Sequence, residues 1–218
     1  MNNAKPNRQP SLGRTLLVLG RVSNLPTVWS NCLAGWIIGG GGPVAHLLVL
    51  CAGASLIYVG GMYLNDAFDV MWDVDHKNDR PIPAGWIKER AVWLMGWTWL
   101  LVGLLLLGTI GSEPLILGGL LVAVILAYDA FHKRISWSPF LMAACRFFLI
   151  LTAASVGGRE GVNGFAIWCA LALAAYIVGL SYLAKAECLP GMLQYWPLVF
   201  LLAPIGLAII VNDGRYRE

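Results

Sequence analysis

Apolar segments of about twenty residues, the length that crosses a bilayer as a helix, follow one another along the sequence. We predict seven such spans, at residues 15–39, 44–64, 91–110, 115–131, 138–156, 165–184 and 195–211. Only 12% of the residues are charged and the mean hydropathy is +0.69, whereas a soluble chain carries about 25% charged residues. The sequence therefore predicts an all-α, polytopic membrane protein with about seven transmembrane helices.

The ends of the chain differ from this apolar region in composition. Residues 1–14 form a polar tail, residues 15–211 form the predicted transmembrane domain, and residues 212–218 form a second polar tail. The first apolar segment is too long for a signal peptide and lacks a convincing cleavage site, so we expect a retained span. The five cysteines are scattered without a CxxC pattern, which favours free thiols. The basic residues lie beside membrane spans, so the net charge of +3 does not indicate a nucleic-acid partner.

Half of the twelve acidic residues lie in one stretch, Tyr63–Arg90. If the helix continues into this stretch, Asp66, Asp69 and Asp73 fall at i, i+3 and i+7, with Asn65 four residues before Asp69, so all four share one face. Converging carboxylates repel one another and require a cation. Oxygen ligands suit Mg²⁺, which binds one or two carboxylates together with water and substrate phosphate.

Basic residues follow the three aspartates in the same stretch, and among them we assign Arg80 to the site. Such donors hold a multiply charged phosphate, so the stretch predicts a diphosphate site. The simpler interpretation is a solvated loop between two spans. That interpretation explains the polarity of the stretch but not the helical register of its acids.

The strings NDAFDVMWD and DRPIPAG resemble the first aspartate-rich motif of the UbiA-type membrane prenyltransferase superfamily and the signature just after it. By loop order, the resemblance covers about residues 14–190. It implies a helical bundle around a central cavity open to the membrane. It also implies Mg²⁺-dependent transfer of a prenyl group from a prenyl diphosphate to an aromatic or other lipid acceptor.

The resemblance also assigns residues. Asp66, Asp69 and Asp73 would be catalytic and hold the metal. Tyr128, Lys133 and Arg134 resemble the family's Tyr-xxx-Lys-Arg element, with one extra residue here. The predicted diphosphate-binding residues are Asn65, Arg80, Tyr128, Lys133, Arg134 and Lys185.

The sequence departs from the family where a second acidic motif, DxxxD, is usual after the sixth span. Here the chain has Ala184-Lys185-Ala186-Glu187, so Glu187 remains as the predicted metal ligand and Lys185 would contact the diphosphate directly. The chain also has about seven predicted spans where nine are usual. The sequence LSYLAKAE at the end of the sixth predicted span (residues 180–187) resembles a short, divergent branch of EboC-type proteins.

Three polar residues lie inside predicted spans, namely Arg21, Asn31 and Arg146. Polar groups within a membrane usually face the bundle interior. We expect these three either to line the acceptor pocket or to serve in helix packing. The three histidines are not spaced as a metal set and receive no role.

These observations favour an Mg²⁺-dependent membrane prenyltransferase. One alternative is a carrier of the same fold that binds a prenylated or diphosphate-bearing lipid without turnover, which the change at residues 184–187 favours. A cation or proton pathway through the acids is a weaker alternative, because they lie at a loop edge. Most basic residues fall on one side of the predicted topology, so we expect a multi-pass inner-membrane protein with cytoplasmic active-site loops.

Overall fold

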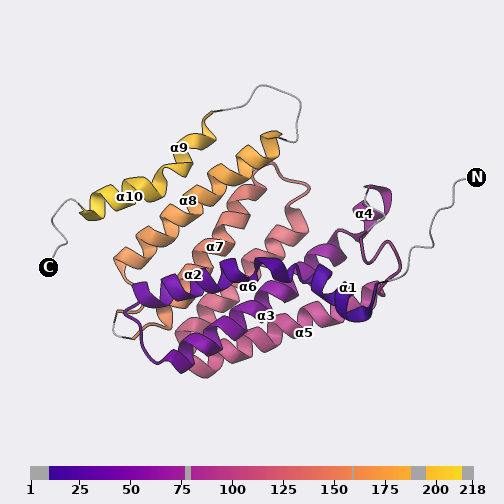
Figure 1. Ribbon diagram of the computed structural model, residues 1–218, viewed down its shortest axis with the longest axis horizontal. Helices are drawn as coiled ribbons and strands as arrows, with labels where there is room; N and C mark the ends of the chain where they lie inside the picture. Colours follow the sequence, from indigo (N-terminus) through magenta and orange to yellow (C-terminus); the bar gives the residue numbers. More distant parts are fainter. Residues whose placement is uncertain (1–9, 77–79, 159, 188–194, 213–218) are drawn as a thin grey trace, which may run out of the picture.

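The computed structural model describes residues 10–76, 80–158, 160–187 and 195–212, and of residues 76, 186, 187 and 212 it describes the backbone alone. All regular structure in these ranges is helical (Figure 1). The elements are α1 (Leu12–Leu19), the 3₁₀ helix η1 (Val22–Asn24), α2 (Leu25–Ile38), α3 (Val44–Phe68), α4 (Val70–His76), α5 (Glu89–Ile110), α6 (Ser112–Phe131), α7 (Ser138–Ser155), α8 (Gly164–Glu187), α9 (Pro197–Leu201) and α10 (Ala203–Asn212).

Within the described ranges, five helices, α3, α5, α6, α7 and α8, are long and apolar enough to cross a membrane. They match five of the predicted spans within a few residues at each end, and they confirm an all-helical, multi-pass membrane protein. The number seven is not confirmed, because the first and last predicted spans are each divided into shorter helices. Helix α1 also begins at Leu12, inside the predicted polar tail.

The first predicted span is interrupted between Gly20 and Asn24. Arg21 has a φ of 43°, in the left-handed region that only glycine adopts without penalty. Helix α2 then restarts at Leu25 with Pro26 in its first turn, where the missing N–H group breaks no helical hydrogen bond. The last predicted span is divided at Leu202, and Pro204 stands in the first turn of α10, where its missing N–H group breaks no helical hydrogen bond.

Helices α3 and α5 pack closely along their length, because glycines let their backbones touch. A Cβ atom added to Gly103 of α5 would lie 2.8 Å from the carbonyl oxygen of Gly53 in α3. Two helical turns further along, a Cβ on Gly60 would lie 2.9 Å from the oxygen of Gly96. Small residues at such spacing are the usual means by which membrane helices pack closely.

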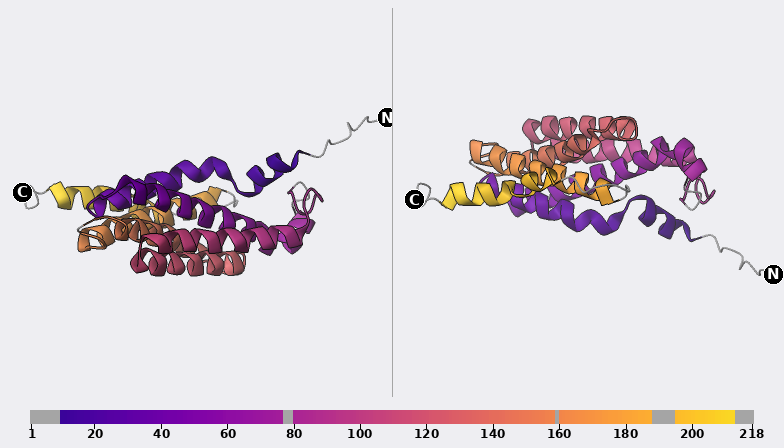
Figure 2. Two further views of the ribbon diagram at one scale, coloured as in Figure 1. Left: turned by 90° about the horizontal axis from the view of Figure 1, so that it is seen from below. Right: turned by 90° about the horizontal axis from the view of Figure 1, so that it is seen from above.

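This pair lies at one edge of a flattened bundle, with α2 and α6 packed against α3 (Figure 1). In both views of Figure 2, α2 lies on one face of the bundle and α5 and α6 lie toward the other. Helix α7 packs against α2, α6 and α8, and α9 and α10 run along the outer edge of α8 (Figure 1). The C-terminal end of α3 and the start of α7 thereby come to the same end of the bundle as α1 and α4.

Candidate functional site

The acidic residues lie where α3 passes into α4. The helical register continues across the junction, since the Asp69 N–H donates to the Asn65 carbonyl (3.0 Å) and the Asp73 N–H donates to the Asp69 carbonyl (2.9 Å). Asp66, Asp69 and Asp73 therefore share one face, as predicted, and all three are buried. Asp73 is the least accessible, with 1% of its surface exposed.

Arg80 returns toward this face and contacts all three carboxylates. Its Nη1 atom lies 2.6 Å from Asp73 Oδ2, 3.4 Å from Asp66 Oδ1 and 3.6 Å from Asp69 Oδ2. Arg80 opens a turn in which the Ala84 N–H donates to the Arg80 carbonyl (2.9 Å), and Gly85 follows with a φ of 72°. A single guanidinium group thus binds the whole motif.

A second basic group comes from the end of α6 and the residues that follow it. Lys133 Nζ lies 2.8 Å from Asp69 Oδ1 and 3.9 Å from Asp73 Oδ1. It also lies 4.1 Å from the ring centroid of Trp72, a cation–π contact. His132 Nε2 is 3.6 Å from Asp69 Oδ2, and its ring stacks on Tyr128 with centroids 4.9 Å apart.

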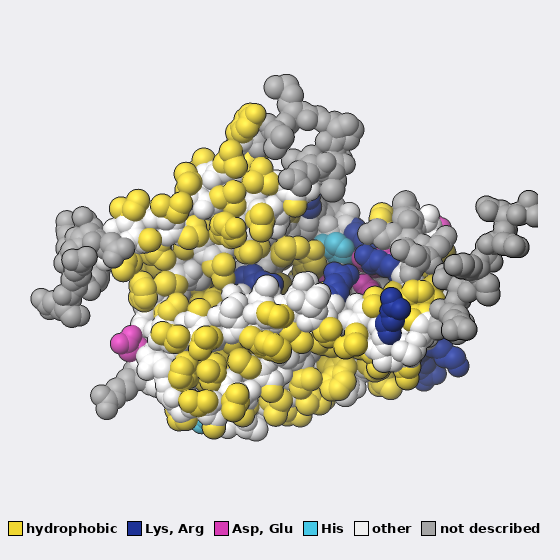
Figure 3. Space-filling view, in the orientation of Figure 1, with side chains coloured by type: hydrophobic (Ala, Val, Ile, Leu, Met, Phe, Trp, Pro, Cys, Tyr) yellow, Lys and Arg dark blue, Asp and Glu magenta, His cyan; other side chains and the backbone are white. Residues whose placement is uncertain are grey.

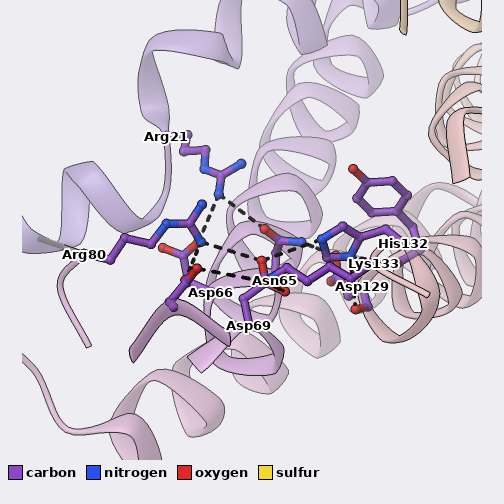
Figure 4. Close-up of polar contacts among 10 residues, drawn as sticks. Arg21, Asn65, Asp66, Asp69, Arg80, Asp129, His132 and Lys133 are labelled. Carbon is purple, nitrogen blue, oxygen red and sulfur yellow. Dashed lines mark hydrogen bonds and ion pairs between the residues drawn. The ribbon is translucent and has the colours of Figure 1, made fainter. Parts of the chain in front are cut away.

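The polar network extends from the acidic motif to the residues between α1 and η1 and to α6 (Figure 4). Arg21 donates to Asp66 (3.0 Å) and Asn65 (3.3 Å), and Asn65 in turn donates to Asp129 (3.0 Å). The hydroxyl of Tyr58 donates to the Arg21 carbonyl (3.3 Å), which helps to hold the left-handed backbone at that position. Four separate parts of the chain are joined in this way.

The charges around Asp69 favour its ionised form. Burial raises the pKa of Asp69, but hydrogen bonds and charge from His132 and Lys133 outweigh burial, so the pKa is below its usual value. The pKa of His132 is raised, because its hydrogen bond to Asp69 stabilises the imidazolium more than burial destabilises it. Both shifts strengthen the attraction between the two groups.

An internal cavity of about 530 Å³ begins at this cluster and continues between α2, α3, α6 and α7. Its charged end includes Asn65, Asp69, Arg80 and Lys133, while apolar side chains line the remainder. Asn65 and Ala54 both line it, and eleven residues of helix separate them, about 16 Å. Figure 3 shows basic, acidic and histidine side chains gathered at the hollow.

The other predicted residues lie at different places. Tyr128, Arg21 and Arg146 line the cavity, whereas Arg134 and Asn31 are outside its lining. Lys185 donates from α8 to the Ser138 hydroxyl (2.8 Å), also outside the lining. The side chain of Glu187 is outside the described part of the chain.

Two residues in this site were not assigned by the sequence reasoning. Asp129 is buried, with 4% of its surface exposed, and lines the cavity next to Tyr128. The spacing of the histidines in the sequence does not suit a metal set, so His132 was given no role. The structure places it against Asp69. The signal for both was an acid and a histidine at i and i+3 at the end of an apolar span, where buried charges are usually functional.

The chemistry of the acidic motif fits Mg²⁺ when the ion is shared with a phosphate group. Within the described residues, no set of three His, Cys, Asp or Glu side chains is arranged to hold a metal ion. However, Asp73 Oδ1 is buried without a hydrogen-bond partner, and Mg²⁺ usually needs only one or two protein carboxylates. The motif therefore suits a metal that enters with its phosphate ligand.

The fold and the site define a class, a multi-pass helical membrane protein whose internal cavity has one charged end and one apolar end. The model of the UbiA prenyltransferase family matches residues 24–188. The chain belongs to the UbiA prenyltransferase family.

Two curated relatives are both named digeranylgeranylglyceryl phosphate synthase. The protein from Methanoregula boonei is 28% identical over 171 residues, which cover 78% of this chain and 58% of the relative. The protein from Methanothrix thermoacetophila is 33% identical over 118 residues, which cover 53% of this chain and 44% of the relative. The chain thus spans about half the length of these relatives.

Two solved structures share the fold. One comes from work described as structural and mechanistic insights into digeranylgeranylglyceryl phosphate synthase in membranes. It has a TM-score of 0.74 at 19% identity, covering 91% of this chain and 76% of the other. The other is the apo structure of a UbiA homologue from Aeropyrum pernix K1, with a TM-score of 0.69 at 15% identity over 94% and 80% of the two chains.

Proposed function

We propose that this protein is an Mg²⁺-dependent prenyltransferase that transfers a prenyl group from a prenyl diphosphate to an acceptor inside the membrane. The observation that carries the proposal is the cavity, which joins the cluster of acidic and basic residues to an apolar chamber. A prenyl diphosphate has the same division, with a charged head and a hydrocarbon tail. The charged end of the cavity is proposed to lie on the cytoplasmic side of the inner membrane.

The charges of the cluster support a role for a metal. Arg21, Arg80 and Lys133 are paired with Asp66, Asp69 and Asp73, so three positive charges already face three negative ones. A diphosphate adds further negative charge, which needs a further cation. Mg²⁺, held by the aspartates, would supply that charge and stabilise the leaving diphosphate.

The transfer replaces one bond with another. The bond between prenyl C1 and the diphosphate oxygen breaks, and its electron pair leaves with the diphosphate. The acceptor then bonds to C1 and releases a proton. Arg80 and Lys133 would stabilise the leaving charge, the apolar walls would exclude water from the allylic cation, and Trp72 and Tyr128 would offer it aromatic faces.

The test is pyrophosphate release from purified protein given farnesyl or geranylgeranyl diphosphate, Mg²⁺ and a pool of lipid-extract acceptors. We expect release that a chelator abolishes. Asp69→Ala removes a carboxylate from the motif and is expected to reduce release at least about a hundredfold. Asp75→Asn, at an exposed acid of the same helix α4, is the matched control and is expected to change little. Undiminished release by Asp69→Ala would refute the role of the motif.

A carrier without turnover is the second candidate, and the position of Lys185 favours it. This residue stands where the family's second acidic motif is usual, yet it contacts Ser138 and lies outside the cavity lining. The site therefore gains no replacement cation from Lys185. Tight binding of the prenyl diphosphate with no pyrophosphate release would support the carrier and exclude the enzyme.

A further inference from the structure

Arg146 is a charged residue inside a membrane-spanning helix. It lies eight residues beyond the start of α7, about 12 Å along the helix axis. Its Nη2 atom donates to the Thr27 hydroxyl at 3.4 Å, and in the described part of the chain it makes no ion pair. Arg21, Arg80 and Lys133, by contrast, each pair with a carboxylate. A charge in this position is costly and usually marks a substrate path.

The surroundings of Arg146 are apolar and belong to the cavity. Val28, Cys145 and Leu149 line the cavity with it, on α2 and α7. Figure 3 shows that Lys or Arg side chains reach the hollow in two places, one beside the acidic and histidine side chains and one among hydrophobic atoms. The cavity therefore has basic groups both at the acidic cluster and in its apolar part.

We propose that Arg146, which is positioned by its hydrogen bond to Thr27 outside the cavity lining, binds an oxyanion carried by the acceptor, either a phosphate or a carboxylate. This inference rests on the proposed function, in which the prenyl diphosphate occupies the acidic end and the acceptor the remainder. A planar guanidinium group forms two parallel hydrogen bonds to such an anion, and the apolar walls strengthen the attraction. The anion would neutralise the unpaired charge and fix the orientation of the acceptor.

The experiment measures equilibrium binding to the full chain in phosphatidylcholine nanodiscs. The probes are octylglyceryl phosphate and octylglycerol, which differ only in the phosphate, and farnesyl diphosphate with Mg²⁺ is measured on the same preparations. Arg146→Gln is expected to weaken binding of the phosphate probe about 10- to 100-fold. Binding of the alcohol and of farnesyl diphosphate is expected to stay within about twofold.

Two further variants and one control sharpen the result. Arg146→Lys keeps the charge but loses the planar fork, so an intermediate affinity is expected. Thr27→Val removes the hydroxyl that accepts from Arg146, with little change of shape. We expect affinity for the phosphate probe to fall a few-fold. This variant still tests the proposal if Arg146→Gln does not fold. Arg14→Gln removes an exposed arginine outside the cavity and serves as the control for loss of charge.

Several outcomes would overturn the proposal. Equal weakening of both glycerol probes would make Arg146 a packing residue, and weakening of farnesyl diphosphate would place it in the diphosphate site. Loss of phosphate-probe binding when phosphatidylglycerol replaces part of the phosphatidylcholine would assign the oxyanion to bilayer lipid. Failure of the wild-type chain to bind farnesyl diphosphate would instead count against the proposed function, because the phosphate probe reports on Arg146 separately.

Discussion

At the scale of residues, the main feature is the contact of one arginine with three aspartates. Arg80 Nη1 lies within 3.6 Å of oxygens from Asp66, Asp69 and Asp73. These carboxylates are almost fully buried, and a buried charge that loses its partner is strongly destabilising. The stability of the site without substrate therefore depends on Arg80, and so does the local fold at the junction of α3 and α4.

Arg80→Gln is expected to lower the stability of the detergent-solubilised protein by about 3 kcal/mol. The physical reason is that Asp73, which is 1% exposed, would keep its charge without its nearest cation. Thermal unfolding followed by circular dichroism measures the effect, and added Mg²⁺ is expected to restore part of the loss. Arg90→Gln, at an exposed position on α5, is the control. An unchanged melting temperature for Arg80→Gln would contradict this account.

At the scale of elements, features set by neighbouring residues could be predicted from the sequence, whereas contacts between distant parts of the chain could not. The register of Asp66, Asp69 and Asp73 depends only on helical spacing, and the structure has that register. The contacts of Arg80 with the aspartates are made after the chain leaves α4, and the contact of Asp129 with Asn65 joins residues 64 positions apart. Gly20 and Pro26 are residues that favour a break in a helix. The long apolar pattern around them nevertheless favoured the prediction of one continuous span.

Gly103→Val tests the close packing of α3 and α5. The added side chain would meet the carbonyl oxygen of Gly53 at 2.8 Å and the side chain of Ile57 at 2.7 Å, so the helices must separate. We expect a destabilisation of about 1–3 kcal/mol, measured by thermal unfolding in detergent. Gly119→Val in α6, where nothing lies within 4 Å of the added Cβ, is the matched control. Equal effects of the two substitutions would argue against backbone contact.

At the scale of the whole molecule, the two ends of the bundle differ in chemistry. The end with the acidic motif also carries the loop after α6, whereas the loop between α7 and α8 lies at the opposite end. The positive-inside rule places the more basic end in the cytoplasm. We therefore propose that the acidic motif lies on the cytoplasmic side of the membrane.

Cysteine labelling in a cysteine-free background measures the orientation. Ser136→Cys, in the loop after α6, is expected to react with a membrane-impermeant maleimide only in inverted vesicles. Val162→Cys, in the loop before α8, is expected to react only from the outer side. Both positions are exposed, so access is set by the membrane. The reverse pattern would place the site outside the cytoplasm and contradict the predicted orientation.

In the free site, Arg21, Arg80 and Lys133 form ion pairs with the three aspartates, so these charges neutralise one another. In the proposed function, the three aspartates would hold the metal and the three basic residues would hold the diphosphate, so binding would exchange one set of ion pairs for another. Few ions then move to or from bulk solution. The affinity for the metal diphosphate should accordingly depend only weakly on added sodium chloride, unlike the attraction between exposed charges, which salt screens over about 10 Å.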